Sequence, residues 1–372
     1  MKKLFLFAAA LLMGAVVPSL GEEVEIIKNP ERPGAKNAGR IVQLEEVLRI
    51  GDESGDFYYK CPRRIEASPD GGFFVLDENE FLSFDEKGNF IDNQFKKGQG
   101  PGEYRYILDF CFQDKKIILY TSQPHKIIAT DLKGSLLKEY RIDHNMSFLR
   151  VRGLFKGNYW FLGANFDIFD KKSKGNIVID QELSYATPQG KIKKTGLLLP
   201  EQWYLEKKIN KAGVAVNMSS PFSALFVMDG AGNLFVMNSQ KHLVQRVELE
   251  KAKIACKFSR EYRSVPYREP KEEKAKSIGP RPEYFADIQK LLIRGDRIWL
   301  LTSTVTAGKG VLVDVFNKKG RYLDNFHLKL PQVKKTYDLL GKVLSLSGEF
   351  LFTVETAEDE NPLVVKYRIK DS

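Results

Sequence analysis

A short repeat organises the chain. Along the 372 residues, a tight-turn pair is followed at once by a run of about four strand-like residues, and this arrangement recurs in six places. The six turn pairs are Gly71-Gly72, Asp114-Lys115, Gly157-Asn158, Gly232-Asn233, Gly295-Asp296 and Gly348-Glu349. Recurrence of one unit along a chain is typical of repeat architectures, so we interpret the sequence as copies of a single structural unit.

A second turn completes the unit in most copies. It has Asp, Asn or Thr in its first position and Gly three residues later, as in Asp85–Gly88, Asp131–Gly134, Thr187–Gly190 and Asn317–Gly320. The polar side chain caps such a turn, and Gly adopts the positive φ that other residues resist. Each unit is therefore predicted to be a strand, turn, strand, longer loop, strand, turn and strand.

These units predict the fold. The sequence has almost no helical periodicity, so the class is all-β, and four-stranded antiparallel units arranged radially make a six-bladed β-propeller. The last unit ends one strand short, whereas the strand-like segment Ile41–Ile50 precedes the first unit. We predict that this N-terminal strand completes the last blade, closes the ring and removes an exposed edge.

The N-terminus has the pattern of a secretory signal peptide. Lys2 and Lys3 are followed by an apolar run, Leu4–Val17, that is too short to span a bilayer. The small residues Ser19 and Gly21 then predict cleavage after residue 21. Cleavage predicts a periplasmic or secreted protein with no remaining transmembrane segment.

Three segments are expected: the signal peptide 1–21, a linker 22–40 rich in Pro, Gly and Lys, and the propeller 41–372. No cysteine lies near the cleavage site, so attachment as a bacterial lipoprotein is not expected. The three cysteines of the chain are scattered and have neither the number of a disulfide framework nor the spacing of a metal site.

The charge of the chain gives little information about its partner. The formal net charge of +10 falls to +8 when Lys2 and Lys3 are removed with the signal peptide. Such a charge could favour acidic polysaccharide, anionic lipid or nucleic acid, but its lysines are interspersed with Asp and Glu. We therefore expect a solvated surface and no nucleic-acid partner.

Three segments of the first two units resemble a known family. Phe73–Asp77, Leu82–Ile91 and especially Lys97–Tyr104 (KGQGPGEY) are similar to the exported bacterial six-bladed β-propellers with NHL- or TolB-like repeats. The resemblance extends over about residues 41–370 and is weaker after the second unit. It implies a propeller fold and an exported location but no established activity, so it assigns no catalytic residue.

The glycine-rich part of that motif invites comparison with phosphate-binding loops. Gly98, Gly100, Pro101 and Gly102 do not form a P-loop or a dinucleotide fingerprint, because neither the Gly-Lys-Ser/Thr sequence nor the GxGxxG spacing is present. We interpret them as a structural turn where the chain crosses from the first blade to the second, with contact to a ligand as the alternative.

Two matching loops offer the strongest candidate for chemistry. His125 and His242 occupy equivalent positions after Thr-Ser-Gln and Asn-Ser-Gln, between the second and third strands of two units, and Asp77 lies at the corresponding place in the first. If these side chains met at the rim of the central funnel, they could bind a divalent metal or provide a general base. Common ancestry of the repeats explains the match equally without any chemistry.

Trp203 and Tyr204 are the aromatic candidates for binding. They lie in a long insertion, Pro200–Ser220, that we expect to be an exposed loop, where an aromatic pair can stack on a sugar or a peptide. The aromatic residues Tyr159, Trp160 and Trp299 instead fall in strand positions and are expected to fill the space between blades.

Together these features predict an exported propeller that binds a protein, peptide or glycan on its loop-rich face, as a monomer and without a cofactor. The chain has no GxSxG elbow, HExxH helix or EF-hand loop. The alternative is a metal-assisted enzyme of the lyase or lactonase type, with its site in the central funnel.

Overall fold

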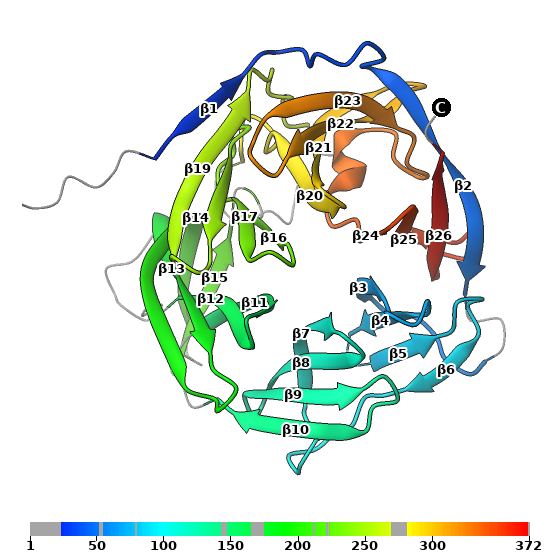
Figure 1. Cartoon of the computed structure of the whole chain (residues 1–372), viewed down its shortest axis with the longest axis vertical. Helices are drawn as coiled ribbons and strands as arrows, with labels where there is room; N and C mark the ends of the chain where they lie inside the picture. The colour runs from blue at the N-terminus through cyan, green and yellow to red at the C-terminus, as the bar shows by residue number, and fades with distance from the viewer. Residues whose placement is uncertain are drawn as a thin grey trace, which may run out of the picture.

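The computed structural model describes residues 24–51, 55–78, 80–142, 147–164, 175–210, 213–220, 222, 224–268 and 281–370. Within these ranges, β-sheets are arranged radially around a central opening (Figure 1). This arrangement confirms the predicted all-β class and the six-bladed propeller. The predicted signal peptide, residues 1–21, lies outside the described residues.

In the first three blades, each sheet begins with the strand nearest the centre and continues outward in chain order. Blade 1 consists of β3 (Pro62–Ala67), β4 (Phe73–Asp77), β5 (Glu80–Phe84) and β6 (Phe90–Asn93). Blade 2 consists of β7 (Tyr106–Gln113), β8 (Lys116–Ser122), β9 (Lys126–Asp131) and β10 (Leu136–Arg141). Blade 3 has a fifth strand and consists of β11 (Ser147–Phe155), β12 (Asn158–Ala164), β13 (Gly175–Ala186), β14 (Ile192–Asn210) and β15 (Gly213–Ser219).

The last three blades follow the same plan. Blade 4 consists of β16 (Leu225–Met228), β17 (Asn233–Met237), β18 (Val244–Glu248) and β19 (Lys253–Arg260). Blade 5 consists of β20 (Ile288–Arg294), β21 (Arg297–Thr306), β22 (Gly310–Asn317) and β23 (Tyr322–Leu328). Blade 6 follows a short 3-10 helix, η2 (Thr336–Leu339), and contributes β24 (Leu344–Ser347), β25 (Phe350–Thr356) and β26 (Pro362–Lys370).

The repeated second turn works as its residues predict. In blade 1, a carboxylate oxygen of Asp85 accepts hydrogen bonds from the backbone N–H of Lys87 at 2.9 Å and of Asn89 at 2.8 Å. Gly88 takes the positive φ of 86° that closes the turn. The same pair of bonds recurs at Asp131 and Asn317, and Asp229 forms it in the first turn of blade 4, between β16 and β17.

The ring closes through the predicted N-terminal strand, β2 (Arg40–Ile50). Residues 43–50 pair antiparallel with β26, so they supply the missing outer strand of blade 6 and confirm the prediction. Residues 40–42 pair parallel with β23 of blade 5. One strand therefore hydrogen-bonds to two blades and joins them into a single eight-stranded sheet.

The segment expected to be a linker also contains a strand. Ile26–Asn29 forms β1, which pairs parallel with β19 at the perimeter of blade 4 (Figure 1). The Asn29 side chain then bonds to the blade 5 turn, because its amide donates to the carbonyl oxygen of Gly320 at 2.9 Å and its oxygen accepts from the Tyr322 N–H at 2.9 Å. The N-terminal segment thus covers the outer edges of blades 4, 5 and 6.

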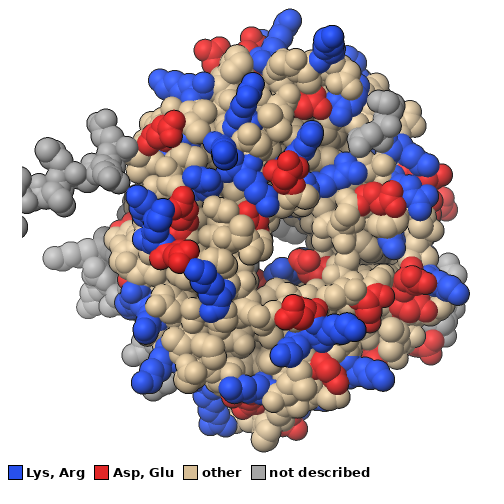
Figure 2. Space-filling model, viewed as in Figure 1, with Lys and Arg blue, Asp and Glu red and all other residues tan. Residues whose placement is uncertain are grey.

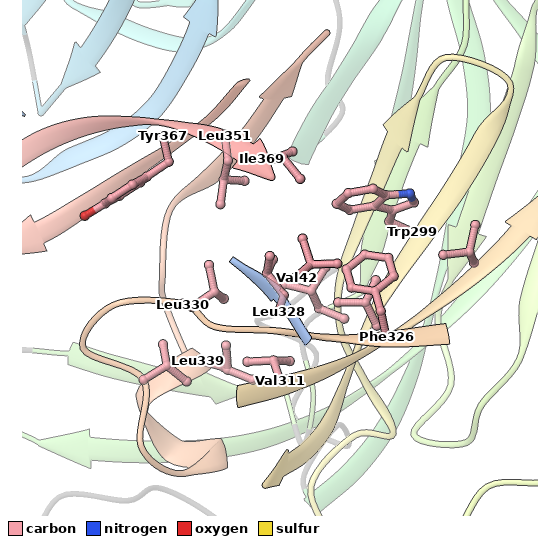
Figure 3. Packing of buried hydrophobic residues seen from close by; sticks show 14 of the residues in the cluster. Val42, Trp299, Val311, Phe326, Leu328, Leu330, Leu339, Leu351, Tyr367 and Ile369 are labelled. Carbon is pink, nitrogen blue, oxygen red and sulfur yellow. The ribbon is translucent and has the colours of Figure 1, made fainter. Parts of the chain in front are cut away.

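Apolar clusters between neighbouring blades form the core. Between blades 5 and 6, Val42 of the closing strand is buried with Trp299 and Tyr367 (Figure 3). The Trp299 and Phe326 rings meet edge to face, with their centroids 4.9 Å apart. Trp160 is buried in the same way between blades 3 and 4. These aromatic residues fill the space between blades, as the sequence predicts.

Candidate functional site

A cavity of about 720 Å³ occupies the central opening. It is lined by residues of the innermost strand of every blade, namely β3, β7, β11, β16, β20 and β24. Figure 2 shows that the ring is hollowed at this place. Ligand pockets usually have volumes of roughly 300–1,000 Å³, so this central channel has the size of a binding site.

The charged side chains that line the channel are mostly basic: Arg63, Arg64, Lys290 and Lys342, against the acidic Glu66 and Asp229. Both acids already have partners. Arg64 donates to Glu66 at 2.8 Å and also pairs with Asp109. Asp229 accepts from the turn amides and pairs with Lys318 at 3.1 Å. The lining that remains available to a ligand is therefore positive.

Lys290 and Lys342 differ from the other basic residues of the channel. Both side chains are half-buried, and neither forms a hydrogen bond or ion pair with any side chain or carbonyl in the described part of the chain. Burial lowers the pKa of Lys290. Burial also lowers the pKa of Lys342, against the opposing charges of Glu355 and Asp338. Their ammonium groups are thus partly desolvated without a partner, which is unfavourable in an empty channel.

Exposed apolar side chains lie where the chain leads into three of the innermost strands. Tyr58 precedes β3 and is 54% exposed, and Leu340 precedes β24. Tyr106 and Leu108 lie at the start of β7, and both are exposed, whereas Ile107 between them is buried. Blades 6, 1 and 2 are neighbours in the ring, as the clusters shared between them show. We call these four exposed residues the apolar rim.

The histidine and aspartate candidates lie apart from the channel lining. Asp77 is fully buried at the end of β4, where its carboxylate accepts from the N–H groups of Lys60 at 2.7 Å and Cys61 at 2.5 Å. His125 lies between β8 and β9 with its ring stacked on Tyr120, the centroids 6.3 Å apart. None of these side chains lines the central cavity.

His242 belongs to a buried cluster between blades 4 and 5. Its Nε2 lies 3.0 Å from Oδ2 of Asp314, whose carboxylate also accepts from Arg260 at 2.8 and 3.0 Å and from the Tyr322 hydroxyl at 2.8 Å. Burial acts to raise the pKa of Asp314, but the bond to His242 and the charge of Arg260 outweigh it and lower the pKa. Asp287 accepts from the His242 N–H at 2.9 Å, and burial raises its pKa.

The convergence expected of His125, His242 and Asp77 at the funnel rim is therefore not observed. Each side chain is engaged by a different set of neighbours, because each loop folds back onto its own blade or the next one. Among the described residues, no group of three or more His, Cys, Asp and Glu side chains is placed to hold a metal ion.

The glycine-rich motif forms a cage around a lysine. Lys126 is fully buried, and its ammonium donates to the carbonyl oxygens of Gly100 at 2.7 Å and Glu103 at 3.2 Å. It also pairs with Glu139 at 3.0 Å, whose second oxygen accepts from the Gly102 N–H at 2.7 Å. Pro101 lies between these partners, and Gly98 approaches the Glu103 side chain so closely that a Cβ would clash. The motif is thus a crossing that encloses Lys126, and we call it the lysine cage.

Trp203 and Tyr204 do not lie in a loop. The segment expected to be an exposed insertion continues β14 as far as Asn210 and returns as β15. Trp203 pairs with Ile177 of β13, and both aromatic side chains are half-buried. At about 4.8 Å per strand, this fourth strand of blade 3 lies roughly 14 Å outward from β11 and the channel.

The sequence contains only faint signals for the residues that the structure brings together. Lys126 precedes three apolar residues of its strand, Ile127–Ala129, which is a weak indication of a buried lysine. Lys290 and Lys342 resemble ordinary surface lysines in sequence. The contacts of Asp314 with His242 and Arg260 join residues more than fifty positions apart, and no local pattern predicts them.

Comparison with known proteins agrees with the propeller. Residues 54–202 match the model of a family described as a 6-bladed beta-propeller, DUF5128. Among solved structures, a Bacteroides fragilis protein described as a candidate exported protein is similar, with 14% identity, a TM-score of 0.52, and coverage of 93% of this chain and 100% of that one. A Bacteroides vulgatus member of the DUF4221 family has 12% identity, a TM-score of 0.56, and coverage of 90% and 99%.

No curated protein matches the sequence. At these identities the solved structures show the fold alone. The architecture and the matched segment define the class of the protein, a six-bladed β-propeller similar to bacterial proteins of that kind. The predicted resemblance is confirmed at this level, whereas the NHL- or TolB-like type of the repeat stays a prediction.

Proposed function

We propose that the protein is an exported binding protein whose ligand enters the central channel from the side of the apolar rim. The observation that supports this proposal is the 720 Å³ channel, which holds two partly desolvated lysines without described partners. Partly desolvated lysines without partners do not increase the free energy of unfolding. A ligand that fills the channel and contacts them does gain from their position.

The predicted signal peptide and the similarity to a protein described as exported support an extracytoplasmic location. In the described part of the chain, no helix is long and apolar enough to cross a membrane. A protein, a peptide or a glycan can each reach the apolar rim, and we propose that the protein binds its ligand as a monomer.

The metal-assisted enzyme is less well supported than binding. Its candidate residues are His125, His242 and Asp77 or other polar groups that face the funnel, whereas Asp77 and His242 are buried against partners of their own. No observation within the described residues favours a lyase or lactonase reaction in the channel.

A ligand screen with mapping of the contact surface tests the binding function. The mature protein is screened by thermal shift against neutral glycans, short peptides and organic anions, and hits are mapped by amide hydrogen exchange. We expect protection in β3, β20 and β24. Protection confined to outer strands such as β10 and β14 would contradict a site in the channel.

A pair of matched variants makes this test specific. Ser345→Trp fills the channel from β24, whereas Gln189→Trp places the same side chain on an exposed turn of blade 3. We expect binding to be lost in the first variant and retained in the second. Equal binding by both variants would place the ligand elsewhere.

A further inference from the structure

The two unpartnered lysines of the channel come from neighbouring blades. Lys290 lies on β20 of blade 5, and Lys342 lies just before β24 of blade 6. The strands β20 and β24 are in contact along the channel wall. Both residues line the same cavity. Two amino groups on adjacent walls of one channel can therefore act on one ligand group.

A buried ammonium needs a counter-charge or several acceptors, and Lys126 shows how the fold meets this need elsewhere. Its ammonium has two carbonyl oxygens within 3.2 Å and the carboxylate of Glu139 at 3.0 Å. Lys290 and Lys342 have no comparable acceptors among the described residues. No charge in that part of the chain offsets the desolvation of Lys290, and the two carboxylates that act on Lys342 offset its desolvation only in part, so an acceptor entering the channel would stabilise both ammonium groups.

The acidic groups that face these lysines are already engaged. On the β3 side, Glu66 is bonded to Arg64, and on the blade 4 side, Asp229 is held by Lys318. Glu355, whose charge acts on Lys342, accepts from the Tyr367 hydroxyl at 2.6 Å and pairs with Arg49 at 3.3 Å. Asp338 accepts from the N–H groups of residues 334 and 335 at 2.8 and 3.0 Å. A further cation of the lining, Arg63 of β3, donates to the Glu78 carbonyl oxygen.

We propose that the central channel binds an anionic group, a carboxylate or a phosphate, between Lys290 and Lys342. The apolar part of the same ligand lies against Tyr106 and Leu108 at the apolar rim. This inference rests on the proposed binding function and specifies its ligand class. Charge-assisted hydrogen bonds to two lysines provide the affinity, and the apolar contacts select among anions.

A carboxylate can reach the channel from two sources, a free organic acid or an acidic side chain of a peptide. Calorimetric titrations with succinate, inorganic phosphate and a Glu-containing tetrapeptide distinguish these sources. Tighter binding of succinate or phosphate indicates a small anion, and tighter binding of the peptide indicates an acidic chain. Failure of all three probes to bind the wild-type protein at millimolar concentration would overturn the proposal.

Lys290→Met and Lys342→Met remove each charge while keeping a long side chain, and Lys193→Met does the same at an exposed position of blade 3. We expect each channel variant to bind the best anion about 10-fold more weakly, the double variant about 100-fold, and the control as the wild type. Equal binding by the double variant would overturn the proposal. Circular-dichroism melting verifies that all variants fold.

This design separates the anion proposal from the binding function. If a neutral glycan from the ligand screen protects the channel strands and binds the double variant normally, the channel is a binding site but not an anion site. If no compound protects the channel strands, both proposals fail. If Lys290→Arg binds the anion as tightly as the wild type and Lys290→Met does not, the positive charge at this position is the cause of the difference in affinity.

Discussion

The lysine cage and the central channel differ in the partners that they provide for a lysine removed from solvent. Lys126 is fully buried, and the KGQGPGEY crossing provides carbonyl oxygens that accept from its ammonium. The N–H of Gly102 in the same crossing holds Glu139, which pairs with that ammonium. Lys290 and Lys342 are half-buried and have no such partners in the described part of the chain. The ammonium of Lys126 is satisfied by acceptors of the protein itself, whereas those of Lys290 and Lys342 gain acceptors when a ligand binds in the channel.

This difference suggests how a propeller separates stability from function. The crossings and blade interfaces hold satisfied charges, including the cluster of Asp314, Arg260 and His242. The channel wall is formed by the innermost strands, which are the end strands of their sheets in the described part of the chain. Substitutions in the two regions are therefore expected to change different properties.

Removal of the caged charge is expected to have the largest effect on stability. Lys126→Met leaves the carboxylate of Glu139 and the carbonyl oxygens of the cage without their cation, which costs about 3–5 kcal/mol of unfolding free energy. Urea unfolding measures this loss. Lys290→Met is the matched control, and an equal loss in both variants would remove the distinction between the two kinds of lysine.

The cluster between blades 4 and 5 extends the comparison to a buried acid. Asp314→Asn removes the negative charge that pairs with Arg260, so it should lower the unfolding free energy by roughly 2–3 kcal/mol at pH 7. Since the folded pKa of Asp314 is lowered, its stabilising effect is present above the unfolded pKa of about 4 and is lost as the pH falls through the lowered value.

The difference in unfolding free energy between wild type and Asp314→Asn should therefore shrink below about pH 4, whereas the exposed Asp296→Asn shows no comparable effect at any pH. Urea unfolding at pH 7 and pH 3 measures both. A difference that stays constant between these two pH values would contradict the role assigned to the Asp314 carboxylate.

The pH dependence of anion binding should reveal the channel lysines. Their pKa values lie below the ordinary 10.5, so their charge is lost at lower pH than that of exposed lysines. Succinate keeps a constant charge at neutral and alkaline pH. Its affinity should be full at pH 7 and fall about 10-fold for each lysine that loses its charge as the pH rises through the lowered pKa values, as measured by titration calorimetry. Affinity that stays constant to a pH above 10.5 would assign binding to other groups.

The smallest predicted effect concerns stability in the channel. Lys290→Met removes a partly desolvated charge that has no described partner, so the unfolding free energy should be unchanged or higher by about 1 kcal/mol. A loss above about 2 kcal/mol in urea unfolding would mean that Lys290 supports the fold.

Much of the fold could be predicted from the sequence because its determinants are local. Turns such as Asp85–Gly88 are specified by a capping side chain and a glycine, and repetition of the unit implies the ring. The missing last strand likewise predicted the closing role of Ile41–Ile50. The Pro200–Ser220 prediction failed because its polar residues resemble a loop, although pairing with β13 holds it as a strand.

The site was far less predictable. A sequence shows that Lys126 and Lys290 are lysines, but it does not show which one the folded chain surrounds with acceptors. The same holds for His242, whose match to His125 reflects the repeat, whereas its contact with Asp314 depends on the neighbouring blade. Partners of this kind are determined by the packing of blades.

Direct observation of the two amino groups tests the central claim. Reductive ¹³C-methylation of the lysines, with Lys290→Arg and Lys342→Arg to assign the signals, allows their titration to be followed by NMR with and without succinate. Both groups should titrate below 10.5 in the free protein, and their pKa values should rise when succinate binds. Titration curves that succinate leaves unchanged at both lysines would contradict an anion site in the channel.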